Sequence, residues 1–196
     1  VGDPDVLCLQ EIRVRPSDVE VTARLVLPGF DAHFALADDR HNVKFRGGRA
    51  NGVVTFVRSA LEPIALPRPS WEREGRLVVT DLPRAGIAVF NLYAINGTDR
   101  PYYDEHGVVD GDRHHFKRRF QARIIDEGRA AIARGRELVV IGDWNVSRTR
   151  IDIYPRLRTS EPHALARSHL NDVLVPELDL VDAFRELHGD ARKYTW

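Results

Sequence analysis

Leu138-Val139-Val140-Ile141-Gly142-Asp143-Trp144-Asn145 is the stretch from which the fold of this chain is predicted. Its first four residues are apolar and mostly β-branched, which predicts a buried strand, and Gly142 predicts the point at which the backbone leaves the sheet. Asp143 and Asn145 lie two residues apart, so in extended backbone their side chains would point to the same side. A carboxylate and a carboxamide placed in this way suit a divalent cation and a phosphate oxygen. An ordinary Asp/Asn turn is the competing interpretation.

Two other apolar segments also end in polar side chains. Near the start of the chain, Leu7, Leu9 and Glu11 share one face of a predicted strand, so that a carboxylate ends a row of core residues. Because an unpaired buried carboxylate is costly, we expect a metal ion or a basic partner beside it; a glutamate that points into solvent is the alternative. Residues 87–93 predict a strand with Tyr93 at its polar end. A tyrosine there can donate to a phosphate oxygen or carry a proton for one, or it can simply cap the core.

The clearest predicted helix runs from Phe116 to Arg134 and ends at Gly135. At about 100° per residue, its apolar side chains fall within one arc, formed by Phe116, Phe120, Ile124, Ile125, Ala131 and Ile132. Lys117 also falls inside this arc, but in the first turn, where a long side chain can reach past the rim of the core. We therefore expect Lys117 to lie over the end of the sheet and to touch a substrate. The alternative is a lysine that only covers the edge of the core.

Shorter elements precede this helix. A capping box at Ser17 to Glu20 predicts a short helix that continues toward Leu27. Three further strands are predicted, at residues 53–57, 77–82 and 87–93. The last two are expected to form a hairpin, so that strands and helices alternate along the chain as in α/β proteins.

The charges of the chain cancel overall, since 29 basic residues face 29 acidic ones. Basic residues nevertheless gather in two segments: five lie between Arg113 and Arg123, and four lie between Arg148 and Arg158 against Asp152 alone. Such patches can supply the phosphate contacts that dominate affinity for DNA. Ordinary solvated surfaces are the alternative interpretation.

Cysteine content, apolar stretches and histidine spacing limit the cellular locations and ligands that are expected. Cys8 is the only cysteine, so no disulfide can form within the chain, and a cytoplasmic location is expected if the source is prokaryotic. No apolar stretch approaches the roughly 20 residues of a membrane helix, so no membrane partner is expected. His114 and His115 have no carboxylate or cysteine at zinc-binding spacing, and no zinc site is predicted.

Taken in order, these segments resemble the exonuclease III and apurinic/apyrimidinic (AP) endonuclease family, which belongs to the endonuclease/exonuclease/phosphatase superfamily. The resemblance covers nearly the whole chain. The residues that carry it are Asp3–Glu11, Asn51–Val54, Glu74–Arg76, Asn91–Tyr93, Gly142–Val146, Thr149 with Ile151–Ile153, Leu180–Phe184 and Tyr194–Trp196.

The resemblance implies an α/β fold: a four-layered sandwich of two mixed β-sheets packed face to face between helices. It also implies a monomeric, Mg²⁺-dependent DNA phosphodiesterase, with Mn²⁺ as the alternative ion, acting on duplex DNA at abasic sites or 3′ ends. By the same resemblance Glu11 looks like the metal-ligand glutamate, with Asp143 and Asn145 as further candidate ligands. Tyr93 looks like the active-site tyrosine, and Asp143 like the aspartate that serves the attacking water or the leaving group. Asn145 and Lys117 are similar to residues that contact phosphate.

The sequence departs from the family pattern in two respects. Residues 146–150 read Val-Ser-Arg-Thr-Arg, where relatives often carry a histidine and an acidic residue. Family members also open with a strand that ends in an asparagine, which should precede Val1, and close with an aspartate and an Asp-His pair, which should follow Trp196. Residues 1–196 are therefore expected to form a single partial domain, incomplete at both ends, with unpaired strand edges and no activity of its own. A natural degenerate copy is the competing explanation.

Two other functions remain open at this stage. The first is a phosphatase or phosphodiesterase of the same superfamily that acts on inositol phosphates, lipids or RNA. The residues around Glu11 and around Thr149 to Ile153 favour the DNA enzymes over this alternative. The second is a non-catalytic DNA-binding protein.

Overall fold

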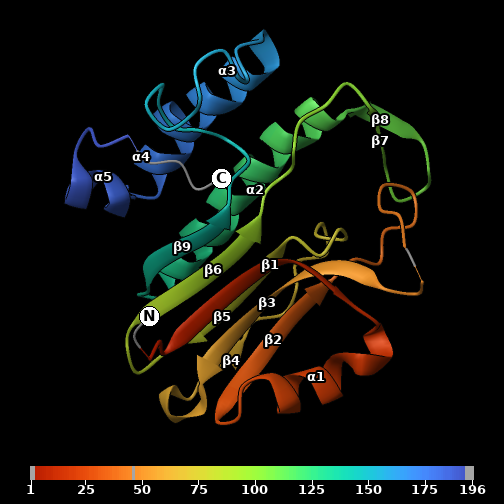
Figure 1. Ribbon diagram of the computed structural model, residues 1–196, viewed down its shortest axis with the longest axis vertical. Helices are drawn as coiled ribbons and strands as arrows, with labels where there is room; N and C mark the ends of the chain where they lie inside the picture. The colour runs from red at the N-terminus through yellow and green to blue at the C-terminus, as the bar shows by residue number, and fades with distance from the viewer. Residues whose placement is uncertain (1–2, 46, 193–196) are drawn as a thin grey trace. The chain divides into compact units, whose positions relative to one another are not determined.

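The computed structural model describes residues 3–45 and 47–192 (Figure 1). They divide into two compact units. The first unit contains the described residues up to Ala94, together with residues 103–110 and 131–143. The second contains residues 95–102 and 111–130 and the described residues from Trp144 onward. None of the described helices is both long enough and apolar enough to cross a membrane.

The first unit is built on two β-sheets. One sheet is antiparallel with the strand order β1-β3-β2, and its strands are β1 (Val6–Val14), β2 (Phe30–Leu36) and β3 (Ala50–Arg58). The other has the order β4-β5-β6-β9, and its strands are β4 (Ile64–Ala65), β5 (Leu77–Leu82), β6 (Ile87–Tyr93) and β9 (Glu137–Asp143). This second sheet is mixed, because β9 runs parallel to β6 while the other pairs are antiparallel.

Apolar side chains from both sheets form the core of the first unit. Val57 of β3 packs with Leu82 of β5 and Val89 of β6, all less than 5 % exposed. Val6 and Cys8 of β1 pack against the same cluster. The two sheets therefore face each other, and the core lies between them.

Helix α1 (Val19–Val26) follows a 3-10 turn at Pro16–Asp18 and lies beside β2. The helix is present, but the predicted capping box is wrong. Asp18 occupies the N-cap without a capping side-chain hydrogen bond, and the Ser17 hydroxyl donates to the Asp18 carboxylate at 3.0 Å instead. The 3-10 turn shifts the start of the helix past the serine that the sequence pattern selected.

Most of the helices belong to the second unit. Helix α2 (Arg113–Ala133) confirms the long predicted helix, and Gly135 follows it at φ +74°. The predicted apolar arc is buried except for Ile132, which is 44 % exposed. The remaining elements are the short strands β7 (Pro101–Tyr103) and β8 (Val109–Asp112), helix α3 (Glu161–Ser168), a π-helical turn (His169–Leu174), α4 (Val175–Glu177) and α5 (Ala183–His188).

The predicted α/β class, with two facing sheets and accompanying helices, is confirmed. The hairpin strands β5 and β6 have the predicted limits, and β3 extends the predicted strand at both ends. Among the described residues, β1 and β9 are edge strands of their sheets. Leu9 on β1 and Val139 and Ile141 on β9 are 37 %, 38 % and 41 % exposed.

Candidate active site

A β-bulge in β1 places Glu11. Pairing between β1 and β3 shifts register between Leu9 and Ile12, and Glu11 has a left-handed backbone with φ 55°. The prediction that Glu11 ends a row of core residues is wrong, because Leu9 is exposed and it is Cys8, on the alternate face, that packs on the core. Regular alternation would direct Glu11 outward with Leu9. Glu11 is indeed exposed, and from the bulge its carboxylate reaches the Tyr93 side chain of the other sheet, to which it is hydrogen-bonded.

A buried asparagine fixes the strand beside this bulge. Asn91 of β6 is fully buried, and its Oδ1 accepts a hydrogen bond from Gln10 Nε2 at 2.8 Å. Its Nδ2 donates to the Val54 carbonyl at 2.9 Å and to the Leu9 carbonyl at 3.4 Å. One side chain of the second sheet thus ties down both β1 and β3 of the first, immediately before Glu11.

Tyr93 is half-buried and hydrogen-bonded to Glu11. Burial, the hydrogen bond to Glu11 and the negative charges of Glu11 and Asp143 together raise the pKa of the Tyr93 phenol to about 12, against the opposing effect of Arg76. The phenol is therefore protonated at neutral pH. A protonated phenol beside a carboxylate acts as a hydrogen-bond donor.

Asp143 lies opposite Tyr93, as its partner in the parallel pairing of β6 and β9. Gly142 makes this pairing possible, since a Cβ on it would lie 1.8 Å from the Leu92 carbonyl oxygen. The prediction that the backbone leaves the sheet at Gly142 is wrong: β9 continues through Asp143, whose carbonyl accepts a hydrogen bond from the Ala94 amide at 2.7 Å. The first unit thus brings Glu11, Tyr93 and Asp143 together.

Arg76 adds a positive charge to this group. Its guanidinium carbon lies 4.9 Å from the centre of the Tyr93 ring, and its Nη1 donates to the Tyr93 carbonyl at 3.1 Å. Its Nε donates to the buried Glu74 carboxylate at 2.6 Å. Gly75, at φ +68°, packs so tightly that a Cβ would lie 2.4 Å from the Ala37 nitrogen. Sequence reasoning did not select Arg76, although Glu-Gly-Arg was part of the resemblance.

Glu72 organises the turn that leads to Arg76. It is 3 % exposed, and its Oε1 accepts hydrogen bonds from the Glu74 amide at 3.1 Å and the Arg76 amide at 2.9 Å. Within the described residues its Oε2 has no hydrogen-bond partner. Burial is the main reason that the pKa of Glu72 is raised to about 7. No sequence pattern pointed to this residue.

The oxygen donors of the first unit fit a hydrated hard cation. Mg²⁺ keeps several waters and typically takes one or two carboxylates together with substrate phosphate oxygens. Glu11 and Asp143 supply two carboxylates next to the same phenol. Over the part of the chain that the structure describes, no three His, Cys, Asp or Glu side chains are grouped so as to hold a metal by themselves. The arrangement therefore suits an ion shared among the protein, water and a substrate.

Asn145 and Lys117 come together in the second unit. Lys117 is 1 % exposed, and its Nζ donates to the Asn145 carbonyl at 2.7 Å. Arg158 donates to the same carbonyl and, at 3.2 Å, to the Asn145 Oδ1. Asn145 has φ 50°, so the backbone is not extended there, and the prediction that it continues the direction of Asp143 is wrong. Two cations on its oxygens favour contact with an anion over ligation of a metal ion.

Positive charge is concentrated around this asparagine. Arg167 Nε donates to the Ser147 carbonyl at 2.8 Å, and its Nη2 donates to the Ser147 hydroxyl at 3.2 Å. The pKa of His163 is lowered, first by burial and then by nearby positive charges that include Lys117 and Arg158. Sequence reasoning placed Arg158 in a basic run and missed Arg167. An arrangement of this kind favours a phosphate group.

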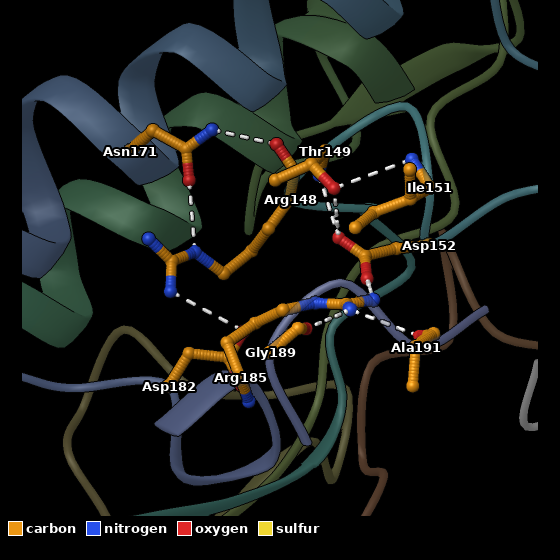
Figure 2. A network of polar contacts seen from close by, with 9 residues as sticks. All are labelled: Arg148, Thr149, Ile151, Asp152, Asn171, Asp182, Arg185, Gly189 and Ala191. Carbon is orange, nitrogen blue, oxygen red and sulfur yellow. Dashed lines mark hydrogen bonds and ion pairs between the residues drawn. The ribbon is translucent and has the colours of Figure 1, made fainter. Parts of the chain in front are cut away.

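Part of the basic run between Arg148 and Arg158 has a structural role, which Figure 2 shows. Arg148 Nε donates to the Asn171 Oδ1 at 3.0 Å, and its guanidinium lies 3.3 Å from the Asp182 carboxylate. Arg185 of α5 forms an ion pair with Asp152. These contacts anchor the segment that follows Asn145 to the helices of the second unit. The Arg148 guanidinium is thus already paired with side chains of the protein itself.

Comparisons with known proteins place this geometry in context. The model of the family described as "Endonuclease/Exonuclease/phosphatase family" matches residues 1–195. A comparison with curated proteins found no match.

Three solved structures share the fold. An AP endonuclease from Archaeoglobus fulgidus has a TM-score of 0.66 at 21 % identity, with 98 % of this chain and 67 % of that chain covered. The 3′ phosphatase NExo from Neisseria, bound to a product DNA hairpin, has a TM-score of 0.64 at 20 % identity, with coverages of 94 % and 65 %. The APE2 catalytic domain from Xenopus laevis has a TM-score of 0.56 at 20 % identity, with coverages of 87 % and 59 %. The chain thus spans about two thirds or less of the length of these structures.

Proposed function

The chain belongs to the endonuclease/exonuclease/phosphatase family, and on that premise we propose that the protein hydrolyses phosphodiester bonds in DNA. The observation that carries this proposal is the meeting of Glu11, Tyr93 and Asp143, which come from three different strands. Two structures with the same fold support DNA as the substrate, since one is an AP endonuclease by name and the other is a 3′ phosphatase bound to a product DNA hairpin. Abasic sites and 3′ ends are accordingly the proposed positions of cleavage.

Each residue has a proposed role in this reaction. Glu11 and Asp143 would hold a divalent cation, for which we propose Mg²⁺, and Asp143 would also orient or deprotonate the attacking water. When bound, the cation supplies positive charge where negative charge builds up on the phosphate and the leaving oxygen. Tyr93 would donate a hydrogen bond to the phosphate, since its raised pKa keeps the phenol protonated. Asn145 and Lys117 would bind phosphate oxygens, a role supported within the second unit by the positive charges of Arg158 and Arg167 around Asn145.

Substitution of Asp143 tests the proposal. In the natural full-length protein with Mg²⁺, Asp143→Ala is expected to lower turnover of an abasic-site duplex by orders of magnitude, because the base and one metal ligand are lost together. Asp126→Ala is the matched control, since Asp126 is exposed on α2, where it pairs loosely with Arg123 at 4.0 Å. Cleavage by Asp143→Ala at the wild-type rate would refute the assignment.

The same assay separates the competing functions. Release of phosphate from inositol polyphosphates without cleavage of DNA would indicate the phosphatase alternative. Salt-sensitive DNA binding without metal-dependent cleavage, even in the wild-type protein, would indicate a non-catalytic DNA-binding protein.

A further inference from the structure

The first unit contains a second feature suited to phosphate, beyond the group at Glu11. It is a pocket of about 250 Å³, which we call the basic pocket. Its lining residues are Arg13, Asn42, Val43, Lys44, Arg49, Asn51 and Arg76. Four of these seven residues carry a positive charge and none carries a negative one. The pocket therefore has the electrostatic character of an anion site.

Three of the four cations in the basic pocket are not neutralised by neighbouring side chains. Arg13 lies on β1, where it pairs in register with Asn51 of β3, and Lys44 and Arg49 lie in the connection from β2 to β3. Over residues 3–45 and 47–192, none of these three side chains has a hydrogen-bond or ion-pair partner. Like charges held around one small concavity repel each other. A bound anion would remove that repulsion.

One wall of the basic pocket is rigidly built. The buried Asp39 carboxylate accepts hydrogen bonds from the His41 amide at 2.8 Å and the Asn42 amide at 3.0 Å. The Asn42 side chain donates to the Tyr103 carbonyl at 2.6 Å and accepts from the Tyr103 amide at 2.9 Å. These bonds fix the backbone immediately before Lys44. The part of the wall formed by Asn42 is thus held in place by contacts within the first unit.

Arg76 links the basic pocket to the candidate active site. It lines the pocket, and its guanidinium also lies 4.9 Å from the centre of the Tyr93 ring. Arg13, another lining residue, follows Glu11 by two positions on β1. An anion in the pocket would therefore lie beside the group bound at Glu11, Tyr93 and Asp143.

We propose that the basic pocket binds a second phosphate group of the substrate, next to the phosphate that is hydrolysed; this inference rests on the proposed function for the location of the first. Successive phosphates one nucleotide apart are a constant feature of a DNA strand, so a neighbouring backbone phosphate is the assigned ligand. Arginine forks match phosphate oxygens in bidentate geometry, and lysine contributes a point charge. The pocket would thereby select polymeric DNA over an isolated phosphate ester.

The test measures DNA binding separately from cleavage. Fluorescence anisotropy of a labelled abasic-site duplex, in buffer without divalent metal, compares the natural full-length protein with its Lys44→Ala/Arg49→Ala variant. We expect affinity to fall about tenfold, the loss of one charge-assisted contact. The slope of log affinity against log salt should fall by about one, because one phosphate is no longer neutralised. Arg24→Ala/Arg84→Ala is the control with the same charge change, at two exposed ion pairs.

A chemically altered substrate identifies the phosphate. A duplex series with one neutral methylphosphonate linkage, moved one position at a time along the cleaved strand, should contain one position that weakens wild-type binding about as much as the variant does. At that position the variant should lose little further affinity, because both changes remove the same contact. The proposal would be overturned if the effects of the methylphosphonate and of the two substitutions on affinity were fully additive at every position. It would also be overturned if the variant lost no more affinity than the control variant.

Two further outcomes separate this proposal from the previous one. If the wild-type protein cleaves DNA but its Lys44→Ala/Arg49→Ala variant binds DNA normally, the proposal for the basic pocket alone is overturned. If the variant shows the predicted loss of DNA binding but the wild-type protein cleaves no DNA, the proposed function is refuted and the phosphate site is supported. A variant that binds inositol hexakisphosphate more weakly but DNA normally would overturn the assignment to DNA.

Discussion

Glu72 and Tyr93 hold their protons at higher pH than the free side chains do, and burial is the main cause in both cases. For Tyr93 the consequence is chemical, since a phenol with a pKa of about 12 serves as a donor at neutral pH. For Glu72 the consequence is energetic. Its carboxyl is ionised at high pH in a place where one oxygen has no partner among the described residues.

Glu72→Gln is expected to change how stability depends on pH. The folded pKa of Glu72 is about 7, above the ordinary value of 4.5, so the folded protein binds this proton more tightly. The stabilising contribution is therefore complete below about pH 4.5 and is lost as the pH rises through about 7. In urea unfolding, the free energy of unfolding of the wild type should fall by on the order of 2 kcal/mol between pH 5 and pH 8. Glu72→Gln should not show this fall. Parallel behaviour of the two proteins would contradict this account; Glu62→Gln, at an exposed carboxylate, is the control.

Asn91→Ala should destabilise the first unit. The substitution removes the partner of the half-buried Gln10 side chain and of the buried Val54 carbonyl, which costs about 1–3 kcal/mol. Urea unfolding of this variant and of Asn96→Ala, an exposed asparagine, measures the difference. Equal stability of the two variants would show that Asn91 does not tie the sheets together.

Residues at strand ends could be predicted from the sequence, whereas residues in turns could not. Tyr93 and Asp143 each end an apolar run, so their position follows from the pattern. Arg76 and Glu72 lie in an irregular segment, where periodicity carries no information about burial. Arg167 lies on a helix, but its role depends on a contact with Ser147, 20 positions away, that only the folded chain reveals.

At the level of elements, the sequence predicts β5 and β6 closely but misses the regular strand β2 and the irregularities of β1 and β9. The limits of β5 and β6 follow from apolar runs with turn residues between them. The bulge at Glu11 and the continued pairing at Gly142 depend on how neighbouring strands align, which a single strand does not encode. Both irregularities position a candidate catalytic residue. Two of the features that escaped prediction thus shape the site directly.

Gly142→Ala tests the close approach of β9 to β6. A Cβ at this position would lie 1.8 Å from the Leu92 carbonyl oxygen, so the strands must separate and Asp143 must move. We expect a loss of stability well above the roughly 1 kcal/mol that a left-handed backbone alone costs an alanine. Gly135→Ala isolates that smaller cost, because Gly135 has φ +74° and nothing within 4 Å of its Cβ position. Thermal unfolding of the two variants makes the comparison, and equal losses would contradict the close approach.

At the level of the whole molecule, the two facing sheets of the first unit account for its core and for its exposed strand edges. An edge strand presents unpaired backbone groups that another chain can extend. In the part of the chain described, β9 is such a strand, with Val139 and Ile141 partly exposed on it. Association through this edge is therefore a property that the fold itself predicts.

Val139→Lys should reduce self-association of the polypeptide 1–196, because a charge on an edge strand opposes pairing with a second edge. Light scattering over a range of concentrations measures the effect. Val21→Lys, at a 57 % exposed valine on α1, adds the same charge away from the edge and should have little effect. Association that is unchanged by Val139→Lys would exclude the β9 edge as its cause.

Anomalous diffraction from crystals of the natural full-length protein soaked with Mn²⁺ would locate the cation in the candidate active site. We expect one strong peak within coordination distance of the Glu11 and Asp143 carboxylates, next to the Tyr93 hydroxyl, and we expect Glu11→Gln to weaken it. A peak bound by other residues, with none at these carboxylates, would contradict the account.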